Sequence, residues 1–127
     1  MDGEIAGLLL GYRLDDPYDT GDLAALPPIV RPLVELESLA PGSWYVNALA
    51  AFPAYRNRGL GTFLLGEADK RARAAGAKSV SLIVAEENAG AMRLYARGGY
   101  RGTARRVLVP FPGLGHGGDW VLMVKSL

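Results

Sequence analysis

Cysteine is absent from the chain, and histidine occurs once among its 127 residues. A chain without thiols has no disulfide framework, no thiol nucleophile and no thiolate metal site. A single histidine also excludes a cluster of imidazole ligands. We therefore expect no metal site, and any chemistry must depend on other side chains or on the backbone.

The chain also lacks a large excess of either charge and any long hydrophobic run. Fourteen Lys and Arg stand against thirteen Asp and Glu, so neither nucleic acid nor a membrane is the expected partner. Residues 1–4 are acidic where a signal peptide would be basic, and the apolar run 5–10 is too short to cross a membrane. We expect a soluble, cytoplasmic protein that forms a single domain over residues 1–127.

The first third of the sequence predicts a strand, a loop and a short helix. Residues 5–14 are apolar and interrupted by two glycines, which favours a strand. Residues 15–28 collect Asp, Pro, Gly and Thr, as loops do. Apolar residues then recur every three or four positions over 29–39, before Pro41-Gly42, so we expect a short amphipathic helix there.

The remainder predicts two more helices within a mixed sheet. Buried strands are expected at 44–52 and 79–84, and the intervening helix has its apolar face over 64–75, so these two strands should be roughly parallel with a right-handed crossover. Asn88 can cap a helix that reaches residue 97. Residues 100–109 and 120–125 read as an antiparallel pair. The fold class is therefore α/β with a mixed sheet.

A glycine-containing loop precedes the helix at 64–75. The start of a helix presents unpaired N–H groups and a partial positive charge, and glycines let an anion approach them closely. Arg56 and Arg58 would add full charges, an arrangement suited to a pyrophosphate. The loop is neither a Walker loop nor a dinucleotide fingerprint, because it has neither of their spacings. Taken alone, Gly59-x-Gly61 is as compatible with a purely structural turn as with an anion-binding loop.

Two longer stretches resemble the signatures of a known family. The loop reads Tyr55-Arg56-Asn57-Arg58-Gly59-Leu60-Gly61-Thr62, which resembles the Arg/Gln-x-x-Gly-x-Gly/Ala signature of the GNAT superfamily of acyl-CoA-dependent N-acetyltransferases. The stretch from Asn88 through Leu94-Tyr95 to Gly99-Tyr100 is similar to that family's second hallmark. The resemblance covers residues 3–127 and implies a GNAT-like mixed sheet with flanking helices.

The resemblance also implies where acetyl-CoA, the acyl donor, would bind. Backbone groups of a splayed strand would pair with its pantetheine arm, the loop and helix start would hold its pyrophosphate, and an asparagine would bond the arm. The implied residues are Leu49, Ala50 and Ala51 on the strand, Arg56, Asn57, Arg58, Gly59, Leu60, Gly61 and Thr62 around the helix start, and Asn88.

Direct acyl transfer to an amine needs a neutral amine, a donor for the developing oxyanion and a proton for the leaving thiolate. The resemblance makes Tyr95 the general acid and a backbone N–H near residues 49–51 the oxyanion donor. Asn88 and Tyr95 lie seven residues apart, on nearly the same helix face if Asn88 is the cap. Alternatively, Tyr95 has no catalytic role and only packs in the core.

No general base can be assigned from the sequence. The amide at Asn47 stands where many relatives carry a carboxylate, and an amide cannot act as a base. Four glutamates could act through water or could be solvated charges only: Glu35, Glu37, Glu86 and Glu87.

One departure from the family affects the acceptor site. Members usually begin with a strand, two helices and another strand that this sequence lacks, which shortens the fold at its N-terminal side. The strand at 5–14 is then an exposed apolar edge unless something covers it. Three explanations compete: a truncated or misassigned start, a naturally short chain that forms a homodimer, and a remnant that binds acyl-CoA without catalysis. The homodimer would bury either this strand or the helix at 29–39.

An N-acetyltransferase acting on a primary amine is thus the leading hypothesis, against a silent acyl-CoA-binding module or a purely structural domain. The acceptor, a small molecule or a peptide, is not specified by a nearly neutral chain. Tyr12 could line an acceptor pocket or only pack, and the loop 15–22, with four aspartates, could attract a cationic amine or simply be solvated.

Overall fold

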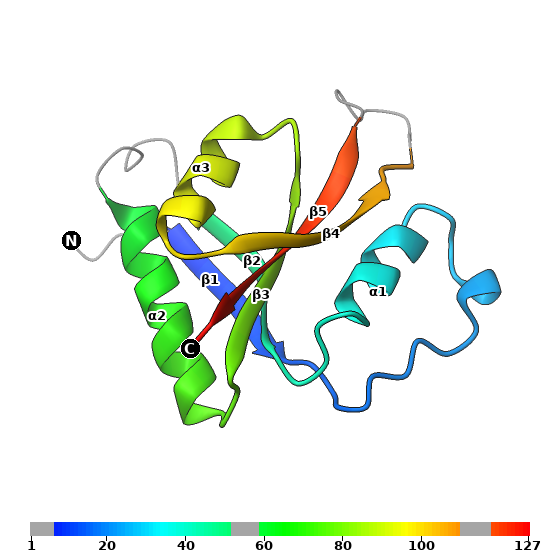
Figure 1. Ribbon diagram of the computed structural model, residues 1–127, viewed down its shortest axis with the longest axis horizontal. Helices are drawn as coiled ribbons and strands as arrows, with labels where there is room; N and C mark the ends of the chain where they lie inside the picture. The colour runs from blue at the N-terminus through cyan, green and yellow to red at the C-terminus, as the bar shows by residue number, and fades with distance from the viewer. Residues whose placement is uncertain (1–6, 52–58, 110–117) are drawn as a thin grey trace.

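A computed structural model describes residues 7–51, 59–109 and 118–127 (Figure 1). The described residues form a mixed five-stranded sheet and three α-helices, which confirms the α/β class. The strands are β1 (Gly7–Arg13), β2 (Trp44–Ala51), β3 (Ser79–Ala85), β4 (Arg101–Val107) and β5 (Asp119–Ser126). The helices are α1 (Arg31–Glu37), α2 (Leu60–Ala74) and α3 (Ala89–Arg97), with a short 3-10 turn at Leu23–Ala25.

The strands lie in the order β1-β2-β3-β5-β4. Strands β2 and β3, which α2 connects, are parallel as the sequence predicts, and every other neighbouring pair is antiparallel. The C-terminal strands are thus the expected antiparallel pair, with β5 inserted between β3 and β4. None of the helices in the described parts of the chain is long and apolar enough to cross a membrane.

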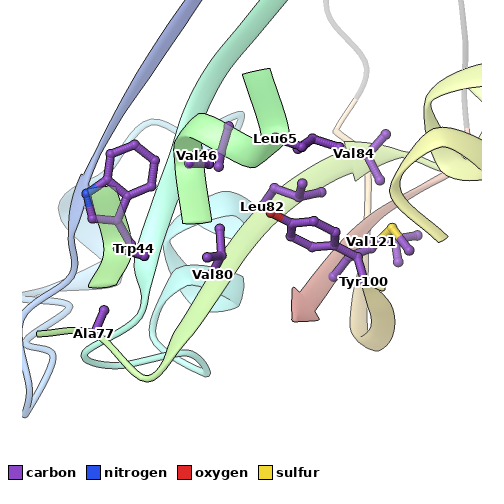
Figure 2. Close-up of a cluster of buried hydrophobic side chains, with 12 residues drawn as sticks. Trp44, Val46, Leu65, Ala77, Val80, Leu82, Val84, Tyr100 and Val121 are labelled. Carbon is purple, nitrogen blue, oxygen red and sulfur yellow. The ribbon is translucent and has the colours of Figure 1, made fainter. Parts of the chain in front are cut away.

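The two faces of the sheet pack against different helices. Helices α2 and α3 cover one face, where Trp44, Leu82 and Tyr100 belong to the larger buried cluster shown in Figure 2. Helix α1 covers part of the other face, where Leu36 is fully buried against Leu122 of β5. Successive strand residues point to opposite faces, so neighbouring residues of β3 and β5 contribute to different clusters.

Helix α1 is shorter than the sequence suggests. It begins at Arg31 and ends at Glu37, and Pro32 lies in its first turn, where its missing N–H costs nothing. The 3-10 turn at Leu23–Ala25 falls within the predicted loop, where the Asp22 side chain accepts a hydrogen bond from the Ala24 N–H at 3.0 Å. A single carboxylate cap of this kind leaves no hydrophobic periodicity, so the sequence pattern does not reveal the turn.

Strand β1 is an edge strand with one covered and one open face. Leu9 packs against the larger cluster, whereas Leu8 and Leu10 on the opposite face are 37% and 57% exposed. This confirms the exposed apolar edge expected from the sequence.

Candidate functional site

The sheet opens between its two parallel strands. Strands β2 and β3 pair only at Trp44–Val80, Tyr45–Ser81 and Val46–Leu82, and the ladder goes no further. Asn47, the next residue of β2, is a bulge, because Leu10 of β1 pairs with Ala48 while Gly11 pairs with Val46. A bulge bends its strand and increases the local twist, so β2 diverges from β3 at this point.

The divergence leaves a cavity of about 380 Å³ between the two strands. It brings together four of the residues predicted for the site, namely Leu49 and Ala50 on β2, Asn88 before α3 and Tyr95 on α3. Backbone groups of β2 beyond Val46 lack ladder partners in the described part of β3. They are therefore available to an extended ligand, as are the groups of any open strand edge.

The cavity reaches both faces of the sheet. Leu82 and Val84 line it and belong to the cluster under α2 and α3, whereas Ile83 and Trp120 also line it and pack with the cluster under α1. The opening is thus bordered by residues from the clusters on both faces of the sheet.

Helix α2 begins without a side-chain cap from the residues that the structure describes. Gly59 is its N-cap with a φ of 73°, a left-handed conformation that favours glycine and offers no side chain to cap the helix. There is no acidic residue in the first turn, and Thr62 there is exposed. Such a helix end attracts an anion through free N–H groups and the helix dipole.

Gly61 has a packing role that sequence reasoning missed. A Cβ at this position would lie 2.9 Å from the Leu94 side chain, so the glycine lets α2 approach α3 closely. Arg56, Asn57 and Arg58 lie outside the described residues, and Ala51 is the last residue of β2.

The start of α3 confirms the prediction that Asn88 caps this helix. Asn88 is the N-cap, and its side-chain oxygen accepts a hydrogen bond from the Ala91 N–H at 3.2 Å. Tyr95 follows two turns later, and burial raises the pKa of its hydroxyl above 10. Its ring lies 6.0 Å from that of Tyr100. A tyrosine is protonated at neutral pH even at its ordinary pKa of about 10, as a proton donor requires, and the raised pKa extends this to higher pH.

The four glutamates differ in what surrounds them. Glu35 pairs with Arg106 at 3.2 Å, and Glu86 pairs with Arg105. Glu87 is exposed, and Glu37 accepts a hydrogen bond from the Tyr18 hydroxyl at 2.8 Å. The ion pairs give Glu35 and Glu86 structural partners.

Trp120 lines the cavity, although the sequence indicates only that it begins a strand at 120–125. It lies on β5 opposite Ala85, the last residue of β3, and the strand pattern itself is the same for a core and a cavity position. Only the divergence of β2 from β3 makes position 120 a cavity position and not a core position.

Solved structures with the same fold include several acetyltransferases. A GNAT family acetyltransferase from Streptococcus pneumoniae superposes with a TM-score of 0.68 at 23% identity, over 100% of this chain and 63% of its own. A GNAT family acetyltransferase from Elizabethkingia anophelis, solved with acetyl-CoA bound, gives a TM-score of 0.67 at 18% identity, over 100% of this chain and 72% of its own. The Salmonella typhimurium protein yncA, solved with its cofactor acetyl-CoA, gives 0.68 at 20% identity, over 100% and 61%.

The chain thus spans about two thirds of the length of these structures. It likewise covers 66% of the chain of another acetyltransferase of known structure. No curated protein sequence matches it significantly. The sequence model of the acetyltransferase (GNAT) family, however, matches residues 1–100. This range is most of the chain and includes β2 and β3, the two strands that border the cavity. The chain therefore belongs to the GNAT acetyltransferase family.

Proposed function

We propose that this protein is an N-acetyltransferase that moves an acetyl group directly from acetyl-CoA to a primary amine. The observation that carries the proposal is the cavity between β2 and β3, with Asn88 and Tyr95 on its wall. Helix α2 lies on the same face of the sheet as α3, which carries Tyr95. Structural neighbours solved with acetyl-CoA support the choice of donor.

The residues present fit acetyl-CoA at two places. The N–H groups at Leu60, Gly61 and Thr62, which no described side chain caps, would hold its pyrophosphate, because a helix N-terminus favours negative charge. The backbone at Leu49 to Ala51 pairs with β1 but has no ladder partner in the described part of β3, and on that open side it would pair with the pantetheine arm, together with the amide of Asn88. When bound, acetyl-CoA would supply a reactive thioester with a thiolate as the leaving group.

Groups of the chain itself would then donate a proton and stabilise the charge that develops during the transfer. The Tyr95 hydroxyl would give the leaving sulfur its proton, and burial extends the pH range over which the hydroxyl stays protonated. An N–H group of β2 near Leu49 that faces the open side, where β3 provides no ladder partner, would stabilise negative charge on the acyl oxygen. The acceptor amine would reach the opening from the face of the sheet that carries α1.

Thr62→Asp should abolish acetyl-CoA binding without harming the fold. An aspartate in the first turn stabilises the helix through its dipole, but it would repel a pyrophosphate at the same N–H groups. In a calorimetric titration we expect micromolar binding by the wild type and at least a tenfold loss in the variant.

Thr62→Asn is the matched control, because it has the same size and no charge, and it should bind within about threefold of the wild type. A replacement of Gly61 would serve less well, since any Cβ there meets Leu94. Equal binding by the wild type and Thr62→Asp would refute the pyrophosphate site.

A silent acyl-CoA-binding module is the second candidate function. It is favoured by the ion pairs of Glu35 and Glu86, which occupy two of the carboxylates considered as bases. Turnover separates the two functions, because a silent module would bind acetyl-CoA and leave every amine unmodified.

We also propose a homodimer formed through the edge of β1. An edge strand with unpaired backbone groups and exposed leucines can add a second copy antiparallel to itself across a twofold axis. Sedimentation should show a dimer that Leu8→Lys converts to a monomer. Phe63→Lys, at a 60% exposed position on α2, should leave the dimer intact. A monomeric wild type would refute the pairing.

A further inference from the structure

Three tyrosines surround one carboxylate on the face of the sheet that carries α1. Tyr12 comes from β1, Tyr18 from the segment after it and Tyr45 from β2, and Glu37 is the last residue of α1. The Tyr18 hydroxyl donates to Glu37 at 2.8 Å, and the rings of Tyr12 and Tyr45 meet edge to face with their centroids 5.8 Å apart. We call these four residues the tyrosine cluster.

The charge of the cluster is negative. Glu37 makes no ion pair with any lysine or arginine in the described parts of the chain, whereas Glu35, two residues earlier, pairs with Arg106. Burial and the neighbouring carboxylate raise the pKa of Tyr12, Tyr18 and Tyr45, so the three hydroxyls stay neutral. The cluster therefore presents one carboxylate together with uncharged aromatic rings.

The cluster borders a cavity of about 300 Å³. Tyr12 and Tyr18 line this cavity, and so do Asp15 and Asp19. Arg13 also lines it, and its side chain donates to the Gly42 carbonyl oxygen at 3.2 Å. The cavity thus gives a ligand access from solvent to Tyr12 and to Tyr18, whose hydroxyl is hydrogen-bonded to Glu37.

Aromatic faces beside a carboxylate are a favourable site for an alkylammonium group. The ring faces attract a cation through their quadrupole, and the carboxylate adds direct charge attraction. An anionic ligand would be repelled by Glu37, and a neutral ligand would gain nothing from it.

The cluster lies near the opening between β2 and β3 but does not coincide with it. Tyr12 and Leu10 are two residues apart on one face of β1, which corresponds to about 7 Å, and they pair with Tyr45 and Ala48 of β2. Ala48 lines the opening, whereas none of the four cluster residues does, so a cation held at the cluster lies beside the opening and not at the reacting position.

We infer that the tyrosine cluster binds a second cationic group of the acceptor, so the acceptor class is an amine that carries two separated positive charges. This inference rests on the proposed acetyl transfer for the identity of the reacting end. The binding of the second cation does not require turnover.

The test is a calorimetric titration of hexane-1,6-diamine and of hexylamine into the full chain saturated with CoA. The two probes have the same carbon chain, and only the diamine has a second cation. We expect the diamine to bind the wild type at least tenfold more tightly than hexylamine. Glu37→Gln should remove that preference, and Glu35→Gln, the same change on the same helix, should retain it.

Tyr12 supplies a second pair of variants at an exposed position that tolerates change. Tyr12→Phe keeps the ring face and should retain most of the diamine preference, whereas Tyr12→Leu should lower it several-fold. Equal affinity for the two probes, or a preference unchanged in Glu37→Gln, would overturn the inference. If the diamine binds selectively but no amine is acetylated, the cluster stands and the proposed function fails.

Discussion

Gly11→Ala is expected to lower the free energy of unfolding by about 3 kcal/mol, the upper part of the range for overpacked positions. A Cβ at residue 11 would lie 2.3 and 2.5 Å from two atoms of the Trp44 ring and 2.7 Å from the Tyr45 carbonyl oxygen. Trp44 is buried in the larger cluster, and a strand carbonyl cannot move away without breaking pairing. Urea unfolding followed by tryptophan fluorescence measures the loss.

Gly66→Ala provides the control for this effect. Nothing lies within 4 Å of a Cβ at Gly66, which is an exposed position within α2. Alanine there should raise the stability by up to about 1 kcal/mol, because it favours the helix. The packing argument fails if Gly11→Ala unfolds at the same urea concentration as the wild type.

Tyr95→Phe is expected to reduce kcat by about 100-fold, the lower part of the usual range for loss of a general acid. The phenyl ring keeps the packing against Tyr100, so stability and acetyl-CoA affinity should change little. Steady-state kinetics with a saturating amine, together with the calorimetric titration, separate the chemical step from binding.

The pH profile follows from the direction of the pKa shift. Burial raises the pKa of Tyr95, so its acid form persists as the pH rises past 10, the ordinary value for tyrosine. The rate of the wild type should therefore increase with pH as the acceptor amine becomes neutral, without a decline below about pH 10. A decline between pH 7 and 9 would point to another proton donor.

Tyr100→Phe is the matched control for the catalytic variant. Tyr100 is 3% exposed, and its buried hydroxyl has no hydrogen-bond partner among the described residues. Its removal should leave kcat within about twofold and should not destabilise the chain, because no hydrogen bond is lost. Comparable losses in both variants would show that the effect of Tyr95 is one of packing.

The order and type of most elements were predictable because the local signals were strong. Asn88 is a favourable cap ahead of an amphipathic helix, and it is the observed N-cap of α3. The segment 79–84 is mostly apolar, with two small serines among its six residues, and it forms most of strand β3. These features depend on neighbours in sequence, which a pattern records directly.

The site was less predictable, because it depends on relations between distant segments. The end of pairing at Val46 follows from the register with β1, and no local pattern contains that register. The contrast between Glu35 and Glu37 likewise requires Arg106 and Tyr18 to be in place. From their positions in the sequence alone, Glu35 and Glu37 were equivalent candidates for a general base.

The bulge at Asn47 means that the opening in the sheet depends on a residue count. With one residue fewer, Val46 and Ala48 would be adjacent and would still pair with Gly11 and Leu10, so β2 could continue alongside β3. Any side chain at position 47 preserves that count. Length in this strand is therefore constrained more strictly than chemical identity, and a single deletion would be more damaging than most substitutions.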